Sequence, residues 1–168
     1  MKAVLILILS LSFILTARGQ ETSMEASNKY EYVIYGEYCG ECTNYCAPMF
    51  KLINNELLGD FSDDFFKNYD APDSNRLVFD NKQPLRREQY LKAKEMMDSI
   101  PDIIFKSDSK IFGEPDDRDQ CGIFFQIKIK DKLKTFYIDT DINAIPIELR
   151  NFANRLMDNW YENAHKLK

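Results

Sequence analysis

Four cysteines are the residues of this chain whose type and spacing point most directly to chemistry. Cys39, Cys42 and Cys46 form a Cys-x2-Cys-x3-Cys segment, and Cys121 follows much later in the chain. Sulfur atoms at this spacing are able to form disulfide bonds, to exchange electrons as a redox-active pair, or to bind a metal ion. The compartment in which the protein folds decides among these three chemistries.

The first 19 residues have the pattern of a secretory signal peptide. Lys2 precedes an apolar run from Ala3 to Leu15, and Ala17 and Gly19 fit the −3 and −1 positions of a cleavage site. The run is shorter than the roughly 20 residues that a membrane-spanning helix needs. We therefore expect residues 1–19 to be removed, the protein to be secreted or periplasmic, and no stable membrane anchor to remain after cleavage.

An oxidising compartment favours two disulfide bonds among Cys39, Cys42, Cys46 and Cys121. Three pairings are possible from the sequence. Because three of the cysteines lie close together, each pairing keeps one bond within that segment and sends the other to Cys121. We favour Cys42–Cys46 with Cys39–Cys121. A bond that closes so long a loop is worth roughly 4–5 kcal/mol when its effect is attributed to chain entropy.

A thiol-disulfide oxidoreductase is the alternative function, with Cys39-Gly-Glu-Cys42 as its reactive pair. A Cys-x-x-Cys after a strand resembles the thioredoxin arrangement, in which a helix N-terminus lowers the thiol pKa. Ile100-Pro101 ahead of an apolar run is similar to that family's proline near its dithiol. Ala47-Pro48 and a strand pattern follow Cys46, however, where the redox site requires a helix. A zinc site on the same cysteines lacks the usual second pair of ligands.

Oxygen-bearing residues near the end of the chain give a weaker metal signal. Asp139, Asp141 and Asn143 have the spacing that begins a calcium-binding loop, but Ala144 and Arg150 stand where Gly and Glu are needed. We expect these carboxylates to be solvated and to lie near the N-terminus of the final helix. The sequence assigns no catalytic residue, no metal ion and no cofactor, and it favours a protein that is not an enzyme.

The charge of the chain limits its partners. The formal net charge is −5, and loss of Lys2 and Arg18 with the signal peptide would make it −7. An acidic chain without a basic run is a poor candidate for binding nucleic acid. We expect an unknown protein or small ligand as the partner, bound on the sheet face away from the helices. Tyr30 and Tyr32 are expected to share one strand face, and tyrosine is enriched at binding surfaces.

Hydrophobic periodicity predicts the elements that position these residues. Helices are expected over 85–99, with Leu91 and Met97 on its buried face, and over 146–163, with an apolar stripe from Leu149 to Trp160. Asn54-Asn55 marks a hairpin turn. Strands are expected over 30–35, 49–53, 56–58, 76–79, 103–105, 122–130 and 134–139.

These elements predict an α+β fold, with an antiparallel meandering sheet of about five to six strands and two helices packed on one face. We expect residues 20–28 to form a flexible leader and residues 29–168 to form a single α+β domain.

The run from Tyr38 to Leu52 resembles the opening of an uncharacterised family of small exported bacterial domains. Members of that family begin with Cys-x3-Cys, matched here by Cys42 and Cys46, and a short strand pair. They continue through a helix to a hairpin and a final amphipathic helix. The resemblance implies export and this type of fold, and it implies no activity. Together with the residue patterns it favours an exported soluble domain that serves as a non-enzymatic binding or interaction module.

Overall fold

The structure is a computed structural model of the chain. It describes residues 29–40, 46–62, 64–68, 71–73, 77, 79, 82–115, 117 and 121–165. The predicted signal peptide over 1–19 and the predicted leader over 20–28 lie outside the described residues, as does Cys42.

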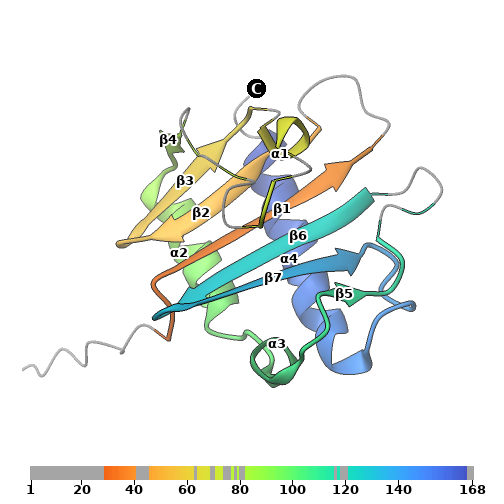
Figure 1. Ribbon diagram of the computed structural model, residues 1–168. Coiled ribbons are helices and arrows are strands. Elements are labelled where there is room, and N and C mark those ends of the chain that lie inside the picture. Colours follow the sequence, from red (N-terminus) through yellow and green to blue (C-terminus); the bar gives the residue numbers. More distant parts are fainter. Residues whose placement is uncertain are drawn as a thin grey trace, which may run out of the picture.

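A seven-stranded sheet forms the centre of the described part of the chain, in the order β4-β3-β2-β1-β6-β7-β5 (Figure 1). The sheet is larger than the five to six strands predicted. It is also not purely antiparallel, because β5 pairs with β7 in parallel. The strands are β1 (Tyr32–Cys39), β2 (Met49–Ile53), β3 (Glu56–Asp60), β4 (Gln83–Pro84), β5 (Ile111–Phe112), β6 (Cys121–Ile129) and β7 (Lys132–Asp139).

The hairpin between β2 and β3 turns at Asn54 and Asn55, as predicted. Ile53 and Glu56 are direct partners in the strand register, so the turn has two central residues. Asn54 has a φ of 48° and Asn55 a φ of 63°. Two positive φ values define the hairpin turn whose twist matches that of the strands, and asparagine adopts them at lower cost than most residues.

Four helices accompany the sheet among the described residues: α1 (Asp64–Lys67), α2 (Arg87–Met97), α3 (Asp102–Lys106) and α4 (Ile147–His165). The predicted pair of longer helices is confirmed, since α2 and α4 lie side by side on one face of the sheet (Figure 1). In α4, the predicted stripe is buried at Leu149, Phe152 and Leu156.

The predicted buried face of α2 is wrong at Leu91, which is 51% exposed. Met97 is buried as predicted, and Tyr90, Ala93 and Met96 are buried with it. Ala93 is completely buried. The helix thus approaches its neighbours through a small side chain, and this rotation turns Leu91 towards solvent.

Two predicted strands are absent from the described residues. The run 103–105 lies in the short helix α3, where the Ile104 N–H donates to the Pro101 carbonyl and the Ser107 N–H donates to the Ile103 carbonyl. A run of three apolar residues is too short to show a helical or strand period, so the preceding proline and the burial of Ile104 decide the conformation. Of the run 76–79, Leu77 and Phe79 are described, and Phe79 has a φ of 53° that an extended strand excludes.

The sheet has a hydrophobic core on each face. Val33 and Tyr35 of β1 point to the core beneath α2 and α4. Ile34 and Tyr38 point to a second core on the opposite face, where Phe65 of α1 packs with them. The central strands are therefore buried on both sides. The sheet face away from the helices, predicted as the partner surface, is covered in part by the chain around α1.

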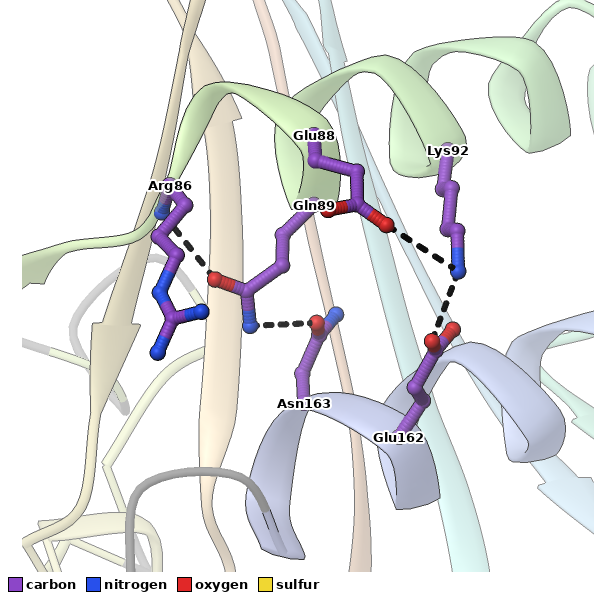
Figure 2. A network of polar contacts seen from close by, with 6 residues as sticks. All are labelled: Arg86, Glu88, Gln89, Lys92, Glu162 and Asn163. Atoms are coloured by element: carbon purple, nitrogen blue, oxygen red, sulfur yellow. Dashed lines mark hydrogen bonds and ion pairs between the residues drawn. The ribbon is translucent and has the colours of Figure 1, made fainter.

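A chain of buried amides fixes the two long helices to each other and to the sheet. The Tyr35 hydroxyl donates to Asn159 Oδ1 at 2.5 Å, and Asn163 Nδ2 donates to the same oxygen at 2.8 Å. Gln89 Nε2 donates to Asn163 Oδ1 at 3.0 Å, and the backbone N–H of Arg86 donates to Gln89 Oε1 at 3.0 Å (Figure 2). Burial raises the pKa of Tyr35 far above its usual value, so the phenol stays a neutral donor.

Ion pairs between the same helices lie at the surface. Lys92 of α2 contacts Glu162 of α4 at 2.6 Å and Glu88 at 3.8 Å, and all three side chains are partly or largely exposed. Exposed pairs of this kind contribute about 0–1 kcal/mol. The rotation of α4 on the sheet is therefore set by the buried amides more than by these charges.

Replacing Asn54 with valine should destabilise the protein by about 1–2 kcal/mol, because a β-branched side chain meets steric repulsion at positive φ. Asn54→Gly should retain the stability of the wild type or exceed it slightly. Urea unfolding of the oxidised proteins measures both. Equal stability of the valine and glycine variants would contradict the turn geometry.

Candidate functional site

Cys39 and Cys121 form a disulfide bond across the two central strands. Cys39 is the last residue of β1 and Cys121 the first of β6, and the strand register places them directly opposite each other. Their Cα atoms are 4.2 Å apart, and 82 positions separate them in the sequence. This is the long-range bond of the favoured pairing. It joins two strands that are remote along the chain.

Cys46 is also disulfide-bonded, and none of the described cysteines is free. Its predicted partner, Cys42, lies outside the described residues. The Cys39 N–H donates to the Cys46 carbonyl at 3.2 Å, so the segment before β2 runs beside the long-range bond. The redox alternative requires a bond between Cys39 and Cys42. Cys39 is bonded to Cys121 instead. Residues 46–48 have no regular structure and lead into β2 rather than into a helix.

A glycine and a tyrosine next to the disulfide allow the strands to meet closely. Gly122 lies opposite Tyr38, and a Cβ atom at Gly122 would be 2.5 Å from the tyrosine ring. The Tyr38 ring covers this glycine and stacks on Phe65 with 4.7 Å between ring centroids. Covering a strand glycine with an aromatic ring protects the backbone that a missing side chain would otherwise expose.

Glu37 is the residue beside the disulfide that sequence reasoning missed. It precedes Cys39 by two positions and so lies on the same face of β1. One of its carboxylate oxygens and the two sulfur atoms all lie within 4.8 Å of one another, and all three side chains are half-buried. Burial raises the pKa of Glu37, and no charged partner or hydrogen bond opposes that effect among the described residues.

A small polar hollow lies between β7 and residues 107–110, which follow α3. Its volume is about 190 Å³. Lys134 Nζ donates to the carbonyls of Phe105 and Ser107 at 2.6 and 3.1 Å, and Lys110 pairs with Asp73 at 2.9 Å. Both lysines are therefore engaged by the protein itself. The lining residues are Asp73, Ser107, Asp108, Ser109, Lys110, Leu133, Lys134, Thr135 and Phe136.

The aspartates at the end of β7 build a turn. Asp139 is only 3% exposed, which corrects the expectation of a solvated carboxylate. Its Oδ2 accepts the Glu114 N–H at 2.9 Å, and its Oδ1 accepts the Asp141 N–H at 2.8 Å. Asp141 Oδ1 in turn accepts the Asn143 N–H at 2.9 Å. The carboxylates of Asp139 and Asp141 thus serve as hydrogen-bond acceptors that order the neighbouring loops.

Tyr30 and Tyr32 do not share a strand face, contrary to the prediction. Tyr30 precedes β1 and packs against the core beneath the helices. Tyr32 packs against the core on the opposite face, where the Lys51 ammonium lies 4.4 Å from its ring centroid. The two rings therefore do not form one binding surface.

Comparison with known proteins assigns no function to the chain. No protein-family model matches the chain, and no curated protein matches it. Within the part of the chain that the structure describes, every helix is too short or too polar to cross a bilayer. The resemblance to exported bacterial domains stays a prediction.

Replacing both Cys39 and Cys121 with alanine should destabilise the protein by about 2–5 kcal/mol, because the bond between them closes a long loop. A matched variant with Cys42 and Cys46 replaced by alanine should lose less stability, since a bond between those two positions would close only a short loop. Urea unfolding under non-reducing conditions compares the two. An equal or larger loss in the matched variant would contradict the role of the long-range bond.

Glu37→Gln should gain stability relative to the wild type as the pH rises from 4 to 7. The folded protein raises the pKa of Glu37. The proton is therefore held more tightly in the folded state, and the associated stability is present below the unfolded pKa of about 4.3 and lost as pH rises through the folded pKa. Unfolding free energies at both pH values test this, with Glu56→Gln on the exposed end of β3 as the control. A difference between Glu37→Gln and wild type that does not change with pH would contradict it.

Proposed function

We propose that the protein is an exported, soluble, disulfide-stapled domain that acts by binding a partner and not by catalysis. The observation that carries the proposal is the bond between Cys39 and Cys121. It uses two of the four cysteine sulfurs to hold the central strands together. The most reactive side chains of the sequence thus serve as a cross-link.

Export is supported by the cysteines and by the start of the sequence. Cys39, Cys46 and Cys121 are all disulfide-bonded. Structural disulfides persist in secreted and periplasmic proteins and are rare where thiol reductants are abundant. Residues 1–19 have the charge and apolar pattern of a signal peptide.

A protein partner is better supported than a small ligand. The hollow between residues 107–110 and β7 has about 190 Å³, below the roughly 300–1,000 Å³ typical of pockets for drug-sized ligands. A larger hollow of about 550 Å³ next to β5 is shallow and open to solvent, so it would enclose little of such a ligand. A ligand that used Lys134 or Lys110 would have to replace contacts that these lysines already make within the protein. The acidic net charge disfavours nucleic acid as a partner.

Protein recovered from the exported fraction of its native host should begin at Gln20 and carry no free thiol. Intact-mass measurement should show the mass of the chain from Gln20 less four hydrogen atoms, and a thiol reagent should not react before a reductant is added. Protein that keeps residues 1–19, remains in the cytosol and has reactive thiols would contradict export. A bond between Cys39 and Cys42 that a mild reductant opens rapidly would favour the oxidoreductase instead.

A further inference from the structure

The end of the β1–β6 pair gathers three groups that are able to bind a metal ion. Cys39 and Cys121 are opposed across the strands, and Glu37 lies on the same face two residues before Cys39. One oxygen of Glu37 and the two sulfurs fall within 4.8 Å of one another. In the oxidised protein both sulfurs are held in the disulfide, so neither is available as a thiolate ligand.

We propose that reduction of the Cys39–Cys121 bond converts this trio into a binding site for Zn²⁺ or a similar thiolate-preferring divalent cation. The reductant is a dithiol. It transfers two electrons and two protons to the disulfide, which becomes two thiols, while the dithiol becomes a disulfide. The metal ion then displaces the two thiol protons and is bound by two thiolates and the Glu37 carboxylate.

The backbone suits this change because the strand pairing does not depend on the disulfide alone. The register continues from Tyr32 opposite Lys128 to Cys39 opposite Cys121, so two thiols formed at its end stay opposed. Zinc–sulfur bonds of about 2.3 Å and zinc–oxygen bonds of about 2.1 Å in a tetrahedral site place the ligand atoms about 3.6–3.8 Å apart. Because the three atoms lie within 4.8 Å of one another, rotation of the side chains would suffice to bring them to that spacing.

The position of Glu37 supports its assignment as a ligand. Its side chain is half-buried, and one of its carboxylate oxygens lies within 4.8 Å of both sulfur atoms. A divalent cation at this point would be attracted to a carboxylate. Two thiolates, one carboxylate and a water molecule complete the four-coordinate arrangement that zinc prefers in sites with an open position.

This site is independent of the proposed binding function, because it exists only after reduction. In an oxidising compartment the disulfide keeps the site closed. Exposure to a dithiol reductant opens it, so the affinity of the protein for the metal ion reports its redox state.

Cobalt(II) titration of a variant with Cys42→Ser and Cys46→Ser tests the site, since only Cys39 and Cys121 then supply sulfur. The protein is reduced with dithiothreitol, freed of reductant by anaerobic gel filtration and titrated. One equivalent of Co²⁺ should produce a thiolate-to-cobalt charge-transfer band and visible d–d bands, which Zn²⁺ abolishes. The air-oxidised variant should show neither. Absence of the bands from the reduced protein would overturn the proposal.

Glu37→Gln in the same background separates a three-ligand site from two thiols alone. The Co²⁺ affinity should fall at least about 10-fold, because even loss of a residue that only supports a ligand commonly costs 10–100-fold. Glu56→Gln should leave the affinity unchanged. Equal affinity of the Glu37→Gln variant and its parent would refute the role of Glu37. If reduction unfolds the variant, Co²⁺ should restore its far-UV circular dichroism, and failure to do so would equally overturn the proposal.

Discussion

The antiparallel pairing of β1 with β6 is the interaction on which the rest of the structure depends. It joins the meander β1-β2-β3-β4 to the hairpin β6-β7, and the chain between them runs through α2, α3 and β5. Bringing such distant segments together costs loop-closure entropy. Burial of the two strands on both faces offsets that cost, with Tyr35 and Phe125 on one side and Phe124 on the other. The Cys39–Cys121 bond makes the same contact covalent.

The buried amide chain adds specificity to this hydrophobic framework. Apolar contacts alone would let α4 slide or rotate on β1, because they have little directional preference. Tyr35, Asn159 and Asn163 each require a partner in the core, and a shift of α4 by one residue would leave them unsatisfied. The same network reaches Gln89 at the start of α2. One strand and two helices are thereby fixed relative to one another.

Elements with a clear period or turn signal could be predicted from the sequence, and elements defined by contacts elsewhere in the chain could not. Asn54-Asn55, the alternation of β6 and the stripe of α4 each carry their own signal. The parallel pairing of Ile111 and Phe112 with β7 and the helical turn at Ile104 depend on distant contacts. The second core escaped prediction because Phe65 comes from a segment of mixed composition and Phe79 was expected in a strand. Its signal was the apolar run from Tyr32 to Tyr35 in β1, typical of a strand buried on both faces.

The cysteines of the site could be predicted from the sequence, but its carboxylate could not. The number of cysteines restricted the bonds to three pairings. Glu37, by contrast, was one acid among many until the strand register placed it beside two sulfurs.

Disulfide mapping tests the central contact most directly. The unreduced protein, unfolded with an alkylating reagent present and cleaved after glutamate, should yield peptide 38–41 linked to peptide 96–148, because the bond between Glu114 and Pro115 resists such cleavage. Peptide 38–41 linked instead to peptide 42–56 would contradict the pairing of Cys39 with Cys121 that closes the sheet.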